Sequence, residues 1–333
     1  MLPRLAYLEF ATRWYGHVRF DLASSGVSPI AQRELGAAPV DDYAARQPFV
    51  EGVAARYGVE PRAVIPCLGA SGALFTAFAT LLGPGDEVLV ETPSYEPVWR
   101  IPEALGATVR RFERGSSNVV VTPKTRVVAI TNPHNPTGSV MDDAELAELS
   151  RALGDVWLLV DEAYMELSRP AHTAFGGRVI TCSSATKCFG VPWARAGFLL
   201  VPPELEAAAR GVEALLFGSA PPGCWAYGAL AFERADHLLA RAHALQAGKR
   251  ALVDAFIRDH GLSWSAPPET SLYGWVHTDA PLGDRIERGI LERGVIVAPG
   301  EFFGDPAAFR LSWSADSETL VQGLEHLGAV LKS

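Results

Sequence analysis

Short apolar runs alternate with stretches of helical length between residues 64 and 201, and this alternation constrains the fold more than any other feature. The runs predict strands at residues 64–67, 87–91, 108–112, 126–130, 156–160, 178–182 and 197–201. The stretches between them predict helices at residues 72–82, 96–105 and 142–153. Strands that are apolar on nearly every residue are typical of a mostly parallel sheet covered by helices on both faces. We therefore predict an α/β fold whose ligands bind beyond the carboxyl ends of the strands.

The pattern changes after residues 219–223, where small residues and prolines interrupt it. Beyond them we predict one long helix at 236–260, strands at 272–277, 295–298 and 309–313, and helices at 285–293 and 318–331. Residues 1–44 show no clear period, and we predict them to be irregular. The chain is therefore expected to form a large domain from residues 45–230 and a smaller α+β domain from residues 1–44 and 231–333.

Composition excludes several classes of function. The chain of 333 residues is 48% hydrophobic and carries a net charge of −9, which argues against a general nucleic-acid binder. No run approaches the ~18 apolar residues of a membrane span. The histidines form no HxxxH or HExxH pattern, so we expect no metal site. No CxxC pair occurs among the four cysteines, which predicts reduced thiols in a cytoplasmic protein. These cysteines are Cys67, Cys182, Cys188 and Cys224.

A lysine with unusual neighbours lies between two predicted strands. Lys187 follows two serines and precedes Arg195 by eight residues. Desolvation and a nearby cation lower the pKa of an amine, and a neutral amine attacks carbonyl carbons to form a Schiff base. The alternative is an ordinary solvated lysine in a loop.

Two more strand ends carry small or aromatic residues. The turn at residues 69–73 lets backbone N–H groups approach a phosphate at the start of a helix, or it only allows close packing. Together with Glu91 it also imitates a dinucleotide-binding fingerprint. Tyr95 follows the next strand and either stacks on a planar ring or covers the core. Ser25 and Gly26 form either a plain turn or a close approach to a ligand.

Three further segments place polar side chains in apolar or stiff surroundings. The prolines of residues 131–138 stiffen the loop that carries Asn135. Asp161 ends a strand, with Tyr164 three residues later, as part of a ligand site or as a helix cap with a packed tyrosine. Arg310 lies inside an apolar strand, where it needs a carboxylate partner, either from a ligand or from an internal salt bridge.

The order of these segments resembles the class I/II aminotransferases of the fold-type-I pyridoxal-phosphate (PLP) family. The resemblance covers roughly residues 45 to 315. It implies a homodimer with a mostly parallel central sheet and a smaller α+β domain. The most specific segments are residues 132–138, 161–164 and 184–195. The chain departs from the family in its reduced N-terminal region and in Thr186, which stands where a serine is common.

The resemblance also implies roles for individual residues. Lys187 would form the internal aldimine and then act as acid and base at the substrate α-carbon. Asp161 would pair with the pyridine nitrogen, and Tyr95 would stack on the ring. Asn135 and Tyr164 would hydrogen-bond the ring 3′-oxygen. The catalytic residues implied are thus Lys187, Asp161 and Tyr164.

Further residues would hold the phosphate and the substrate. The implied phosphate ligands are Ser184, Arg195 and the N–H groups of Ala70, Ser71 and Gly72. Arg310 would bind the substrate α-carboxylate, helped by the backbone near Ser25 and Gly26. Tyr43 would reach the phosphate of a partner subunit. No convincing second arginine for a dicarboxylate side chain is recognisable in the sequence.

We therefore expect a PLP-dependent aminotransferase that moves an amino group from an amino acid to a 2-oxo acid. A PLP-dependent β-lyase or decarboxylase is the nearest alternative, because the same motifs serve those reactions. A nicotinamide-dependent oxidoreductase and a cofactor-binding regulator without turnover are more distant ones. Six aromatic residues either line a side-chain pocket or pack in the core. They are Trp14, Tyr15, Phe20, Trp275, Phe302 and Phe303.

Overall fold

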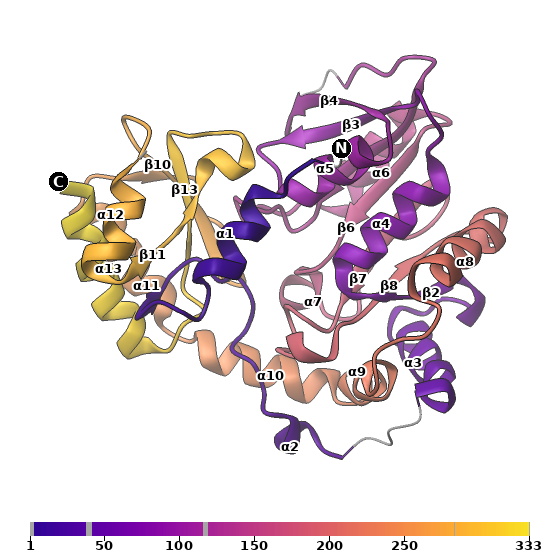
Figure 1. Ribbon diagram of the computed structural model, residues 1–333, viewed down its shortest axis with the longest axis horizontal. Coiled ribbons are helices and arrows are strands. Elements are labelled where there is room, and N and C mark those ends of the chain that lie inside the picture. Colours follow the sequence, from indigo (N-terminus) through magenta and orange to yellow (C-terminus); the bar gives the residue numbers. More distant parts are fainter. Residues whose placement is uncertain (1–2, 38–41, 116–118, 283, 333) are drawn as a thin grey trace.

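A seven-stranded sheet forms the centre of the molecule (Figure 1). The computed structural model describes residues 3–37, 42–115, 119–282 and 284–332. The strand order is β2-β8-β7-β6-β5-β3-β4, and neighbouring strands from β4 to β7 are parallel. Only β8 runs antiparallel to its neighbours. The strands are β2 (Val64–Leu68), β3 (Glu87–Thr92), β4 (Thr108–Glu113), β5 (Thr125–Thr131), β6 (Trp157–Asp161), β7 (Val179–Ser184) and β8 (Ala196–Leu200). The predicted mostly parallel sheet is confirmed.

Helices cover both faces of this sheet, which explains why its inner strands are buried along almost their whole length, whereas the edge strand β4 is partly exposed. Alternate residues of β3 show the two faces: Val88 and Val90 pack in the cluster that contains α4, whereas Leu89 packs with Leu146 of α6. The helices are α3 (Asp42–Tyr57), α4 (Gly69–Leu81), α5 (Glu96–Ala104), α6 (Asp143–Leu153), α7 (Met165–Ser168), α8 (Pro203–Phe217) and α9 (Cys224–Glu233). Two short 3₁₀ turns, η1 (Pro61–Ala63) and η2 (Pro192–Ala194), complete this part.

A second group of elements is built from both ends of the chain. An antiparallel sheet has the order β12-β13-β10-β9, and β1 near the N-terminus pairs in parallel with β11. The strands are β1 (Phe20–Asp21), β9 (Ser263–Trp264), β10 (Tyr273–His277), β11 (Val295–Ile296), β12 (Ala298–Pro299) and β13 (Ala308–Ser312). The helical elements are α12 (Asp284–Arg293), η3 (Gly300–Phe303) and α13 (Ser317–Lys332). The β1–β11 pairing, a separate two-stranded sheet, ties residues from before position 44 to the C-terminal group of elements.

The prediction that residues 1–44 are irregular is wrong. Helix α1 (Ala6–Trp14) and the short helix α2 (Gln32–Leu35) lie in this segment. No local side chain caps α1. Instead, the N–H groups of Ala6 and Tyr7 donate to the Glu96 carboxylate at 3.1 and 2.7 Å. A helix whose cap lies 90 residues away in the sequence leaves no local signal.

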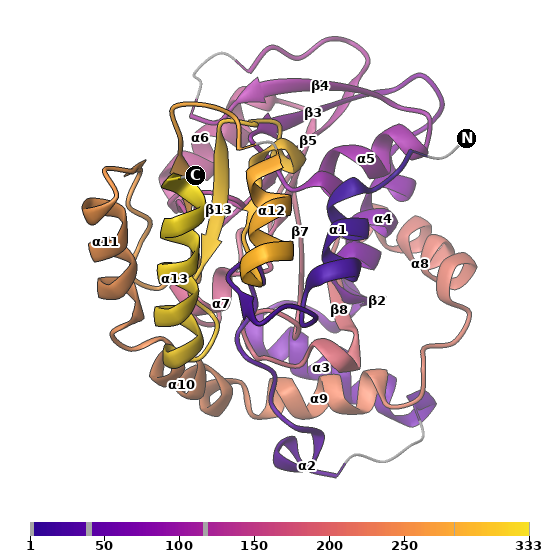
Figure 2. The same cartoon turned by 60° about the vertical axis from the view of Figure 1, so that its left-hand side comes forward.

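Helix α1 lies between the two groups of elements, as Figures 1 and 2 show. Tyr7 packs edge-on against Tyr95 from the large sheet and against Phe303 from the C-terminal group, with ring centroids 5.5 Å apart in both pairs. The N-terminal helix therefore covers the region where the carboxyl ends of the parallel strands meet the C-terminal sheet.

Two other predicted elements are divided in the structure. The single helix expected at 236–260 is α10 (Ala235–Gln246) followed by α11 (Lys249–Asp259). Gly248 separates them with φ of 75°, a left-handed conformation that ends a helix. The strand expected at 295–298 is split into β11 and β12, which belong to different sheets. Among the helices in the described ranges, none combines the length and apolarity that a membrane crossing requires.

Candidate active site

The carboxyl ends of the strands surround a cavity of about 250 Å³. Most of the residues that the sequence singled out line this cavity, and they come from segments far apart in the chain. The predicted residues in its lining are Ser25, Ala70, Ser71, Tyr95, Asn135, Asp161, Tyr164, Ser184, Lys187 and Arg195. Three predicted residues, Gly26, Gly72 and Arg310, are not part of the lining.

Lys187 lies in the turn that follows β7 and is part of the cavity lining. Burial, together with the positive charges of Arg310 and Arg195, lowers the pKa of Lys187 to about 8. Gly26 packs against the Lys187 side chain, since a Cβ atom at this glycine would lie 3.4 Å from the lysine Cδ. The alternative of an ordinary solvated loop lysine is wrong, because this side chain is partly buried, lines the cavity and has a lowered pKa.

Asp161 ends β6 and is 6% exposed. Burial raises the pKa of Asp161 to about 6, so the carboxyl group is ionised at neutral pH. One of its oxygens accepts a hydrogen bond from the N–H of Ala163 at 3.0 Å. Helix α7 begins at Met165 with Tyr164 as its N-cap, so the alternative in which Asp161 caps a helix is wrong.

Tyr164 links the strand ends to the N-terminal segment. Its hydroxyl group lies 2.7 Å from the hydroxyl of Ser25. Its ring stands edge-on against Tyr273 of β10, with the centroids 4.9 Å apart. Ser25, which was predicted to help bind substrate, therefore also orients Tyr164.

One end of the cavity has the properties of an anion site. Helix α4 starts there without a side-chain cap, so the N–H groups of its first turn need partners. Arg195 is exposed, and no carboxylate in the described ranges forms an ion pair with it. Gly69 has φ of 70° and lies so close to the Arg195 guanidinium that a side chain there would collide with it. Gly72 belongs to the same first turn, beneath Phe217 of α8.

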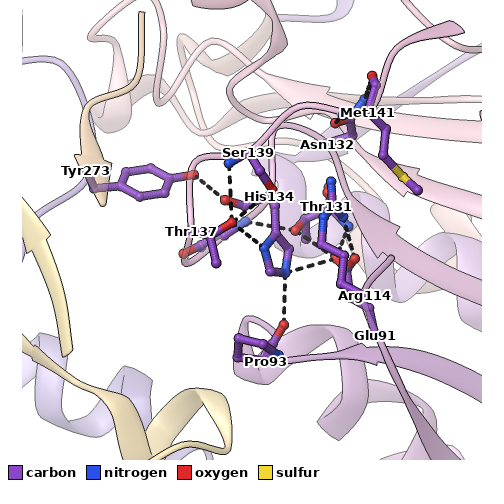
Figure 3. Close-up of polar contacts among 11 residues, drawn as sticks. Glu91, Pro93, Arg114, Thr131, Asn132, His134, Thr137, Ser139, Met141 and Tyr273 are labelled. Atoms are coloured by element: carbon purple, nitrogen blue, oxygen red, sulfur yellow. Dashed lines mark hydrogen bonds and ion pairs between the residues drawn. The ribbon is translucent and has the colours of Figure 1, made fainter. Parts of the chain in front are cut away.

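Hydrogen bonds hold the loop that carries Asn135 (Figure 3). The Asn135 N–H donates to the hydroxyl of Thr131 at 2.9 Å. Thr131 in turn donates to Glu91 from its backbone N–H at 2.6 Å and from its hydroxyl at 3.0 Å. Glu91 also pairs with Arg114 at 2.5 Å. The loop is therefore fixed by a buried network as well as by its prolines.

Glu91 and His134 are fully buried. One carboxylate oxygen of Glu91 lies 3.6 Å from the His134 ring (Figure 3). Because Glu91 is 0% exposed and already paired, it cannot bind a ribose, and the dinucleotide-fingerprint interpretation is wrong. The His134 ring lies 2.7 Å from the Thr137 hydroxyl and 2.9 Å from the Pro93 carbonyl oxygen. Burial lowers the pKa of His134 to about 4, so this imidazole is neutral and structural.

Arg310 on β13 is 0% exposed and lies behind the cavity wall. Its guanidinium donates to the Asn135 side-chain oxygen at 2.6 Å, to the Tyr7 hydroxyl at 2.9 Å and to the Ala23 carbonyl at 2.9 Å. No carboxylate within the described ranges pairs with it. The internal salt bridge considered for Arg310 is therefore absent from this part of the chain.

Several lining residues were not predicted. Tyr7, Leu8 and Ala11 of α1 line the cavity, and so do Thr131, Ala163 and Thr186. Tyr15, one of the six candidate aromatics, lines the cavity. Phe20, Trp275 and Phe303 are buried in the core of the C-terminal group, whereas the partly buried Trp14 and Phe302 line a separate cavity of about 370 Å³. Tyr7, Leu8 and Ala11 lie on α1, whose cap is the distant Glu96, so no local start signal in the sequence identified them. Tyr43 cannot be placed, because its side chain lies outside the described part of the chain.

The arrangement fits the cofactor that the resemblance implies. A phosphate matches the uncapped start of α4 and the unpaired Arg195. An ionised Asp161 matches a protonated pyridine nitrogen, and the Lys187 amine matches an aldehyde. The buried hydroxyl of Thr186 has no hydrogen-bond partner, which is also expected where a polar ligand binds.

Comparisons with known proteins agree with this geometry. The family model described as aminotransferase class I and II matches residues 41–327. Capreomycidine synthase from Streptomyces vinaceus is 28% identical, over 97% of this chain and 92% of that protein. Aspartate/prephenate aminotransferase from Thermus thermophilus is 30% identical, over 82% of this chain and 76% of that protein. The structure of a PLP-dependent aminotransferase from Streptococcus suis superposes with a TM-score of 0.88 at 24% identity. The match covers 99% of this chain and 98% of that one, so the two proteins share a fold.

Proposed function

Because the chain belongs to the aminotransferase class I and II family, we propose that Lys187, Asp161 and Arg310 perform the central tasks of its reaction. The chain is a PLP-dependent aminotransferase, which moves an amino group from an amino acid to a 2-oxo acid. The observation that carries the residue assignment is the meeting of Lys187, with a pKa of about 8, and an ionised Asp161 in one cavity.

The cofactor would bind in the cavity between the strand ends and α1. Arg195, Ser184 and the N–H groups of Ala70, Ser71 and Gly72 at the start of α4 would hold its phosphate. Tyr95 would stack on its ring, and Asn135 and Tyr164 would hydrogen-bond its 3′-oxygen. When bound, the cofactor supplies a cationic ring that withdraws electrons from the substrate α-carbon.

Each charged side chain then has a defined task. Lys187 takes the proton from the substrate α-carbon and returns it, since an amine with a pKa of about 8 exchanges protons readily near neutral pH. Asp161 stays ionised above a pH of about 6 and holds a positive charge beside it. Arg310 binds the α-carboxylate, and Ser25 and Gly26 position the substrate against Lys187.

We also propose a division of the chain into two domains, a homodimer and a cytoplasmic location. Residues 45–230 form the cofactor-binding domain, and residues 1–44 with 231–333 form the domain that supplies Arg310. Two copies form a homodimer in which Tyr43 reaches the partner's phosphate site. The four cysteines are free and buried, which supports a cytoplasmic location.

The visible absorption spectrum tests the proposal. The purified protein with PLP is titrated with a panel of amino acids in the absence of a 2-oxo acid. We expect a visible band that at least one amino acid bleaches, with one equivalent of the matching 2-oxo acid released. Lys187→Ala should lose turnover by several orders of magnitude while it still binds the cofactor. Near-wild-type turnover in Lys187→Ala would disprove the assignment.

A PLP-dependent lyase or another non-transferring reaction is the second candidate. It is favoured by one finding: the relative that matches 97% of this chain is named a synthase rather than an aminotransferase. The fate of the amino nitrogen separates the two. Transfer to an added 2-oxo acid supports the aminotransferase, whereas release of ammonia or carbon dioxide without transfer supports the lyase or decarboxylase.

A further inference from the structure

The aromatic ring of Tyr7 stands between Arg310 and the cavity. Arg310 is fully buried and does not line the cavity, whereas Tyr7 and Asn135 do, and both are hydrogen-bonded to its guanidinium. Among the described atoms, the Arg310 Nε has no hydrogen-bond partner. A carboxylate that approaches Arg310 from the cavity therefore meets the Tyr7 hydroxyl on its way.

The hydrogen bonds of the Tyr7 hydroxyl leave its proton available. The oxygen accepts one hydrogen bond from Arg310 at 2.9 Å and a second from the Tyr15 hydroxyl at 3.1 Å. A phenol oxygen has one proton and can accept about two hydrogen bonds, so donation is the capacity that remains. No acceptor for this proton occurs in the described part of the protein.

The position of this hydroxyl is fixed by its surroundings. Glu96 holds the backbone N–H of Tyr7 at 2.7 Å. Tyr7 is 5% exposed, and its ring stands edge-on against the rings of Tyr95, Phe302 and Phe303, with the centroids 5.5, 6.0 and 5.5 Å away. A side chain held on several sides loses little entropy when it binds a ligand.

We propose that Tyr7 is a substrate-binding residue whose hydroxyl donates a hydrogen bond to the substrate carboxylate attracted by Arg310. A carboxylate is the ligand that this site recognises, because a buried guanidinium without a carboxylate partner among the described residues is hydrogen-bonded to a phenol of the cavity lining whose own proton is not donated there. Helix α1 thus contributes directly to binding of the α-carboxylate. This inference rests on the proposed function, in which Arg310 binds that group.

Equilibrium binding to the holoenzyme tests the role of Tyr7 without turnover. The probes are 3-phenylpropanoate and its neutral amide, and each dissociation constant is measured by calorimetry. Tyr7→Phe removes only the hydroxyl and keeps the ring packing. We expect its dissociation constant for the carboxylate to rise about tenfold to a hundredfold, because a hydrogen bond to a charged group is lost. Binding of the amide should change by less than about threefold, since a neutral group gains less from the donor.

Tyr273→Phe is the matched control. Tyr273 is also a buried tyrosine beside Arg310, but its hydroxyl donates to the backbone oxygen of His134 at 3.4 Å and does not line the cavity (Figure 3). Its ratio of carboxylate to amide affinity should stay within about twofold of wild type. If Tyr7→Phe does not fold, Tyr7→Leu also lacks the hydroxyl, and the same fall in this ratio is expected.

An unchanged ratio in the Tyr7 variants would overturn the inference, and so would tighter carboxylate binding, which would mean that Tyr7 competes with the ligand for Arg310. A wild-type holoenzyme that does not bind the carboxylate would overturn it as well. The proposed function fails separately: a holoenzyme that binds the carboxylate with the expected dependence on Tyr7, yet transfers no amino group, contradicts the transfer reaction alone.

Discussion

Burial shifts the pKa values of Lys187 and Asp161, two ionisable residues that line the cavity, in opposite directions. It lowers the pKa of the Lys187 amine to about 8 and raises the pKa of the Asp161 carboxyl to about 6, because each group loses hydration of its charged form. The pKa values thereby move toward neutrality from both sides. Near pH 7 the carboxyl group is ionised, and roughly a tenth of the amine is neutral.

The pH dependence of Lys187 labelling follows from this shift. Only the neutral amine reacts with trinitrobenzenesulfonate, so in the apoenzyme labelling should be low below pH 8 and rise to a plateau above it. The midpoint should lie near 8 instead of the ordinary value of 10.5. Peptide mapping can follow Lys187 separately from the exposed Lys124.

Arg195→Gln provides the control for the electrostatic part of the shift. Burial is the largest cause, followed by Arg310 and Arg195, so loss of one cation should move the midpoint upward without restoring the ordinary value. A wild-type midpoint above pH 10 would contradict the assignment of Lys187 as an amine of lowered pKa.

Lys187 and Asp161 could be predicted because their positions relative to apolar strands are visible in the local sequence. Asp161 ends β6 and Lys187 lies in the turn after β7, and the parallel topology brings such strand ends together. Tyr7 and the buried partners of Glu91 depend on contacts between distant segments. Tyr7 reaches Arg310 across 303 positions of the chain, and no spacing rule in one sequence predicts such a contact.

At the scale of elements, helix periodicity alone did not locate the boundary between α10 and α11. Residues 236–260 keep enough apolar residues for one helix, but Gly248 adopts φ of 75° and starts α11 in a new direction. Glycine is tolerated within helices and is also favoured where they end, so the presence of Gly248 does not distinguish one long helix from two. The course of the chain around it is set by tertiary packing.

Gly248→Ala tests whether this break is built into the backbone. An alanine in the left-handed region costs roughly 1 kcal/mol, so the variant should unfold at a lower denaturant concentration. Gly211→Ala is the matched control, because Gly211 lies inside α8 with nothing within 4 Å of its added Cβ and no left-handed φ. It should stabilise the protein by up to about 1 kcal/mol. Equal stabilisation by both changes would contradict the assigned break.

At the scale of the whole molecule, the site is assembled from three parts of the chain. Helix α1 and Ser25 come from the N-terminal segment and the strand ends from the central sheet. Arg310 of the C-terminal sheet lies behind the lining and is hydrogen-bonded to Asn135 and Tyr7. Sequence motifs identified the central part in detail because they follow strands directly. Arg195 remains exposed at the anion end of this assembly, which leaves room for a residue from a second subunit.

The proposed homodimer can be tested through a site shared between subunits. If Tyr43 acts on the phosphate site of the partner, Tyr43→Ala and Lys187→Ala subunits are each inactive alone. When they are mixed and reassociated, half of the dimers are hybrids with one intact site, so roughly a quarter of the wild-type activity should return. Activity of the mixture is compared with each parent treated identically, and sedimentation measures the mass. A mixture that stays inactive although hybrid dimers form would place Tyr43 in its own subunit's site. A single-chain mass would exclude the dimer, because cross-subunit rescue requires two copies in one particle.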